Sequence, residues 1–200
     1  MMRRSKKVWS SRGLSSTGES SLGKRRLIKT LKWIIYSLYL IFAYVIMVTP
    51  KLMEISAIKP LLILPLTVCI GVFEGELSGG IFAIFAGFVW GANDVALFTG
   101  YYSLILFFCA VICGLFIKYF FKTKLINVVF LSSLSLILYL LTSFYFKYGM
   151  RGYEGLTVLF VKNYIPTFIY TLLTTPFYFI LIRWTHTAFR TSGTNLAEEV

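Results

Sequence analysis

The stretch PLLILPLTVCIGVFEGELSGGIFAIFAGFVWG, residues 60–91, consists of two apolar runs on either side of the short charged segment EGE. A bilayer core about 30 Å thick requires about 17–25 apolar residues in a helix. We therefore expect two membrane-spanning helices here, over residues 60–73 and 77–95. Pro60 suits a first helical turn, whereas Pro65 is expected to kink the first of these helices, which is also short.

The rest of the chain has the same apolar character. Of its 200 residues, 58% are apolar and 14% are charged, whereas soluble domains average about 45–50% apolar and about 25% charged residues. A water-soluble fold of this size has too few charges to cover so many large apolar side chains. This composition excludes a soluble enzyme, a secreted disulfide scaffold and a disordered protein, and it indicates an integral membrane protein.

Four further apolar runs complete the expected set of spans. They cover residues 33–49, 101–121, 125–146 and 164–184. The expected fold is therefore an all-α integral membrane protein, a bundle of six transmembrane helices. Five spans result if the second and third form a re-entrant pair. In the last span, Pro166 is placed in the first turn and Pro176 is expected to bend the middle.

The charges predict the orientation of the chain. Ten of its twenty Lys and Arg residues lie in the first 32 positions, ahead of any apolar run. With six spans and an inside amino terminus, fifteen basic residues lie inside and five outside, as the positive-inside rule requires. We expect a disordered basic cytoplasmic tail at 1–31, a membrane domain at 32–185 and a short cytoplasmic tail at 186–200. The basic tail suits anionic lipids rather than nucleic acid.

Small residues recur at every fourth position from Gly71 to Gly91. Helix–helix association in lipid depends on close backbone approach, which small residues at this spacing permit. Gly79, Ala83 and Gly87 share one face of the third span, and Gly91 ends the series. This face is a candidate interface, either for packing within the bundle or for a partner, and the third span should be central in both cases.

Charged residues near the apolar runs are the candidates for partner contacts, because charge at membrane depth is costly. Glu74 and Glu76 are solvated if their junction is a cytoplasmic turn, and are partner or proton sites if it dips inward. Asp94 beside Asn93 is a helix cap or a binding residue. In the outer segment 147–163, Arg151, Tyr153 and Glu154 suit a solvated loop or a protein contact, and residues 156–161 a short interfacial helix.

Residues for catalysis are scarce. The sequence has one histidine, His186, and one aspartate, and it lacks the HExxH, GxSxG and Gly-rich phosphate-binding motifs. Cys69, Cys109 and Cys113 all fall in apolar runs and are expected to be small buried hydrophobic residues rather than metal ligands. We therefore expect no enzyme activity, no catalytic or metal-binding residues and no cofactor.

The segment from Lys59 to Phe189 resembles the rod shape-determining protein MreD family in its Gram-positive, clostridial form. The resemblance rests on the stretch from Lys59 to Gly91, on GYEGL at 152–156, on NYIPTFIYTLLTTPFYF at 163–179 and on RWTH at 183–186. Members of the family often carry an acidic residue where Gly91 stands, whereas the acid here is Asp94. The basic tail is also longer than the family pattern.

The resemblance implies a non-enzymatic membrane scaffold of the cell-elongation machinery, which determines rod shape and positions peptidoglycan synthesis. Its implied partners are an MreC-like membrane protein, an actin-like filament and peptidoglycan synthases at the bacterial cytoplasmic membrane. The alternative is a substrate-binding membrane subunit of an energy-coupling-factor vitamin transporter. Its ligand site would use Trp90, Asn93, Asp94 and Tyr153.

Overall fold

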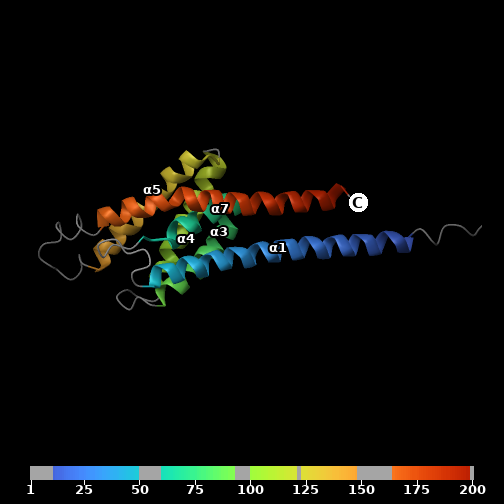
Figure 1. The fold of residues 1–200 in the computed structure, drawn as a ribbon, viewed down its shortest axis with the longest axis horizontal. Helices are drawn as coiled ribbons and strands as arrows, with labels where there is room; N and C mark the ends of the chain where they lie inside the picture. The colour runs from blue at the N-terminus through green and yellow to red at the C-terminus, as the bar shows by residue number, and fades with distance from the viewer. Residues whose placement is uncertain (1–10, 50–59, 93–99, 121–122, 148–163, 199–200) are drawn as a thin grey trace, which may run out of the picture. The chain divides into compact units, whose positions relative to one another are not determined.

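The described part of the chain is helical. The computed structural model describes residues 11–49, 60–92, 100–120, 123–147 and 164–198, and these form six helices. Figure 1 shows them coloured in chain order. Their bounds are α1 Ser11–Val48, α2 Ile63–Glu74, α3 Glu76–Gly91, α4 Tyr101–Tyr119, α5 Leu125–Lys147 and α7 Ile165–Glu198.

Four of the helices contain a segment long and apolar enough to cross a bilayer. These segments are Arg26–Val48, Tyr101–Tyr119, Leu125–Phe146 and Ile165–Phe189. Helices α2 and α3 are shorter, with 12 and 16 residues, or about 18 Å and about 24 Å at 1.5 Å per residue. The all-helical fold is thus confirmed, and four of the described helices are long and apolar enough to cross a membrane.

The helices at the two ends of the chain are longer than the expected spans. Helix α1 begins at Ser11 and α7 ends at Glu198, so helix replaces much of the disordered tail predicted at 1–31 and of the short tail at 186–200. Nucleation of the first turn is the costly step of helix formation. Once a helix has formed over an apolar span, each further residue that joins it adds one hydrogen bond. The two helices therefore extend beyond the apolar runs, while the boundaries of the membrane domain at 32 and 185 remain predictions.

The chain divides into two compact units. One comprises residues 39–183, and the other comprises residues 1–38 together with 184–200. In the smaller unit, the hydroxyls of Thr30 and Ser37 donate to the carbonyls four residues earlier, Arg26 and Trp33, each at 3.0 Å. Such bonds satisfy polar groups within their own helix.

The core of the larger unit lies around α2. Ten of the twelve residues of α2 are buried, and a helix that is apolar on every side is expected at such a position. Helix α2 packs on both α3 and α4, and the most extensive packing in the unit joins α3 to α4. The expectation of a central third span is therefore met jointly by α2 and α3.

Pro65 does not lie in the middle of a helix. Helix α2 begins at Ile63, three residues later than predicted, so Pro65 falls in the first turn. The amide nitrogens of a first turn have no partner within the helix, so a proline there removes no hydrogen bond. Pro166 likewise lies in the first turn of α7, whereas Pro176 lies inside it.

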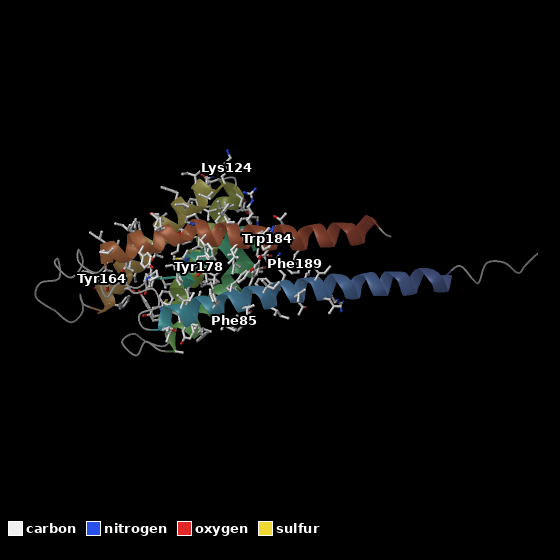
Figure 2. All side chains as sticks on the ribbon, in the orientation of Figure 1. Phe85, Lys124, Tyr164, Tyr178, Trp184 and Phe189 are labelled. Atoms are coloured by element: carbon white, nitrogen blue, oxygen red, sulfur yellow. The ribbon has the colours of Figure 1, made fainter. Side chains whose placement is uncertain are left out.

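Large apolar side chains cover much of the surface of the larger unit. Leu173 is 74% exposed, Leu77 73% and Phe85 64%; Figure 2 labels Phe85 on α3. Exposed apolar area on this scale is not found on soluble monomers. It fits helices that are solvated by lipid tails.

One long-range hydrogen bond fixes the chain just before α2. The Thr171 hydroxyl of α7 accepts the backbone N–H of Leu61 at 2.9 Å and donates to the Thr167 carbonyl at 2.7 Å. The buried hydroxyl therefore acts both as a hydrogen-bond acceptor and as a hydrogen-bond donor.

Thr171→Val should lower the free energy of unfolding by about 1–3 kcal/mol, because it leaves the Leu61 N–H without its acceptor while keeping the side-chain shape. Denaturation of the purified protein in detergent measures the change. Thr174→Val is the matched control, since the Thr174 hydroxyl bonds only within α7, to the Thr171 carbonyl. Equal stability of the two variants would contradict the prediction.

Candidate functional site: the glycine contacts of α2, α3 and α4

A tight turn joins α2 to α3. Gly75 lies between Glu74, the last residue of α2, and Glu76, the first of α3, and has φ of 91°. A residue with a Cβ is strained in this conformation, whereas glycine adopts it readily. The turn therefore reverses the chain within one residue and brings the first turn of α3 beside the end of α2.

Three glycines bring the backbones of three helices of the larger unit together. A Cβ on Gly79 of α3 would collide with the Gly71 Cα of α2 and lie 2.8 Å from its nitrogen. A Cβ on Gly71 would lie 2.7 Å from the Ala110 carbonyl oxygen of α4, and one on Gly114 would lie 3.0 Å from the Gly71 oxygen. The backbones of α2, α3 and α4 are thus in direct contact. We call Gly71, Gly79 and Gly114 the glycine triad.

The same face of α3 continues toward its carboxyl end. Ala83 is fully buried, and a Cβ on Gly87 would collide with the backbone of Ser103 in α4. A Cβ on Gly91 would lie 3.4 Å from a ring carbon of Tyr102, an ordinary contact distance. Gly79, Ala83 and Gly87 therefore pack against neighbouring helices of the same chain, and the fit loosens at Gly91.

A hydrogen bond accompanies the Gly87 contact. The Ser103 hydroxyl donates to the Ile84 carbonyl at 3.0 Å, so it crosses from α4 to α3 where the two backbones meet. Polar links of this kind add to the packing of helices in lipid.

The acidic residues of the turn lie at the edge of this contact. Glu76 forms an ion pair with Lys118 of α4, with 2.5 Å between Oε1 and Nζ. The Glu76 side chain is 30% exposed and that of Lys118 is 53% exposed. Glu74 is partly exposed and also interacts within the structure. The alternatives for this junction were a solvated turn and a segment that dips inward. The partial exposure of both glutamates agrees with the solvated turn, and Glu76 is in addition paired with α4.

An aromatic cluster occupies the other end of α3. Trp90 stacks on Tyr102 with 4.7 Å between ring centroids and lies 5.2 Å from the Tyr139 ring of α5. All three side chains are at least 94% buried. Trp90, a candidate ligand contact of the transporter alternative, is thus part of the helix packing.

The remaining candidates lie outside the described residues. These are Asp94, Arg151, Tyr153 and Glu154, together with Asn93 and the predicted interfacial helix at 156–161.

The cysteines are buried, as predicted. Cys69, Cys109 and Cys113 are free thiols, and the Cys113 Sγ lies 3.1 Å from the Ser135 Oγ of α5. Among the residues that the structure describes, no group of three or more His, Cys, Asp and Glu side chains has the arrangement of a metal site.

Sequence patterns did not identify Gly114 and Ser103 of α4 as residues that contact the other two helices. Gly114 follows Ala110 at the four-residue spacing of small residues, a signal not used in the sequence analysis, and Ser103 is an ordinary polar residue near a helix start. Gly71 belongs to the recognised series, but its burial between two helices depends on the turn at Gly75. Only the long-range register of the helices identifies these contacts.

Comparison of the chain with protein-family models, curated proteins and solved structures found no match. The fold itself defines an all-helical protein with four helices long and apolar enough to cross a membrane.

Gly79→Ala should destabilise the protein by about 1–3 kcal/mol, the usual cost of overpacking, because its Cβ meets backbone that cannot rotate away. Gly80→Ala is the matched control: it has the same gain in helix propensity, but its Cβ meets only the Val111 and Phe107 side chains, at 2.8 and 2.9 Å. Unfolding in mixed detergent micelles compares the two. A Gly80→Ala variant as unstable as Gly79→Ala would show that backbone contact is not the cause.

Proposed function

We propose that this protein is a non-enzymatic membrane scaffold of the bacterial cell-elongation machinery, related to the MreD family. The observation that carries the proposal is the glycine triad and its continuation along α3. The α2 and α3 side of these contacts, with Gly71, Gly79 and Gly87, lies in the stretch 60–91, which is one of the stretches that carry the family resemblance. The residues behind the resemblance thus serve to hold three helices in fixed positions.

A fixed arrangement of helices suits a docking subunit. Several polar groups buried in it pair with their neighbours: the Ser103 hydroxyl bonds the Ile84 carbonyl, and the Tyr101 and Ser143 hydroxyls lie 3.3 Å apart. Groups engaged in this way hold the helices in register. A bundle with a rigid interior presents its helical surface to partners without a further cost in conformational entropy.

We propose six membrane spans, of which α2 and α3 are the two short ones. The direct backbone contacts between α2, α3 and α4 support this arrangement, because helices shorter than the bilayer are accommodated when they pack inside protein. The distribution of basic residues supports cytoplasmic termini. The implied partners are an MreC-like membrane protein, an actin-like filament and peptidoglycan synthases, with anionic lipids bound by the basic tail.

A cysteine introduced at Gly152 should react with a membrane-impermeant maleimide on intact cells, because six spans place residues 148–163 outside. A cysteine introduced at Ser5 should react only after permeabilisation. The native cysteines are buried and provide the low background that the assay needs. Protection of the Gly152 position on intact cells would overturn the arrangement.

Depletion of the protein should convert rod-shaped cells to round ones, and the tagged protein should copurify with an MreC-like partner. Microscopy and mass spectrometry of the purified complex measure these outcomes. Unchanged cell shape, together with copurifying ATPase subunits and a retained vitamin, would refute the scaffold and favour the transporter subunit. Re-expression of the intact chain is the control that assigns the shape change to this protein.

A further inference from the structure

Helices α4 and α5 enclose an apolar groove of about 440 Å³ between them. Its walls include Ile112 and Phe116 of α4 and Phe130, Leu134, Leu138 and Leu141 of α5. Leu134 is 53% exposed and Phe130 62%, so the groove opens at the lipid-facing surface of the pair. We call this cavity the α4–α5 groove.

The floor of the groove has little capacity to bind a polar ligand. Cys109, Cys113 and Ser135 line it, and their polar atoms interact with one another or with the helix backbone. The Cys109 thiol lies 3.9 Å from the Ser135 carbonyl oxygen, in addition to the contact between Cys113 and the Ser135 hydroxyl. The groove therefore suits a hydrocarbon occupant.

The size of the groove favours a chain over a helix. Its volume lies in the range of about 300–1,000 Å³ that is typical of small-molecule pockets. A partner helix is about 10–12 Å across with its side chains and needs several times this volume to run along three turns of α5. A flexible acyl chain fits such a space without displacing α4 or α5.

The charge at one end of the groove complements an anionic headgroup. Segment 101–147 contains no acidic residue and four lysines, of which Lys118, Lys122 and Lys124 fall in sequence at or near the junction of α4 and α5, at this end, and Lys147 at the other end of α5. Lys118 lies one turn or less beyond Phe116, and exposed Lys124 precedes α5 at the turn that joins α4 to α5 (Figure 2). Lys118 is paired with Glu76, which leaves Lys124 as the described amine best placed for a phosphate.

We propose that the α4–α5 groove binds an anionic phospholipid, with one acyl chain between the helices and the phosphate at Lys124. Basic pockets between transmembrane helices on the cytoplasmic side recognise lipid headgroups in this way, and the anionic lipids of that leaflet supply the ligand. The site is separate from the basic amino-terminal tail; it rests on the orientation proposed above, but not on the scaffold function.

The test uses the full-length protein, delipidated in detergent and incubated with vesicles of equimolar phosphatidylglycerol and phosphatidylcholine with identical acyl chains. Native mass spectrometry measures the lipid that the protein retains. Retained phosphatidylglycerol should exceed phosphatidylcholine about fivefold, the factor expected for one lysine near a charged lipid surface. Equal retention of the two lipids would overturn the proposal.

Two substitutions separate the chain site from the charge site. Leu134→Trp should fill the groove and abolish retention of both lipids, whereas Leu173→Trp, at an exposed position of α7 outside the groove, should not. Lys124→Gln should remove most of the preference for phosphatidylglycerol, while Arg183→Gln, at an exposed position of α7 outside both the groove and the basic tail, should leave it intact. If Leu134→Trp does not fold, Leu138→Phe, which adds less volume, serves as the groove-filling variant.

Unchanged lipid retention in both groove-filling variants would refute the site. Dimers in the mass spectrum that Leu134→Trp dissociates, without a change in retained lipid, would also refute it and show that a second copy of the chain occupies the groove. Competition by inorganic phosphate as strong as that by phosphatidylglycerol would show an anion site without a lipid.

Discussion

The direct contact between backbones at Gly71, Gly79 and Gly114 is the constraint on which the larger unit depends. Lipid tails are as apolar as the protein interior, so an apolar side chain gains little free energy by moving from lipid into the bundle. Helices in a bilayer therefore associate through close packing and through hydrogen bonds between them. Glycine allows two helix backbones to approach most closely, and here each of the three helices supplies one glycine. Because α2 is held on two sides by backbone, almost its whole circumference is buried, although it is the shortest helix described.

The positions of the helices follow from the sequence, but their ends do not. Apolar run length located all six described helices, and two starts, those of α4 at Tyr101 and α5 at Leu125, match to the residue. The extensions of α1 and α7 run through polar segments whose composition resembles a tail. The start of α2 was also misplaced, because Pro60 and Pro65 are equally compatible with a first helical turn and composition does not choose between them.

The small-residue face of α3 was predictable, but its partners were not. Spacing placed Gly79, Ala83 and Gly87 on one side of a helix, since this depends only on the helical period. The residues they meet depend on how far α4 is shifted along α3, and no local pattern encodes this shift. The ion pair between Glu76 and Lys118, which are 42 residues apart, shows the same limit: its register is fixed by the antiparallel packing of α3 and α4.

Helix α4 has two dissimilar sides, and this difference explains how one bundle is both rigid and adaptable. Toward α2 and α3 it presents Ala110, Gly114 and the Ser103 backbone, where any added atom collides with main chain. Toward α5 it presents larger side chains that leave a groove, with the thiols of Cys109 and Cys113 at its floor. Glycine contacts fix helix positions because main chain cannot repack, whereas contacts made by flexible side chains can adjust to an occupant. We therefore expect variation in helix spacing to be confined to the α5 side of α4, while the α2–α3–α4 contact moves as one body.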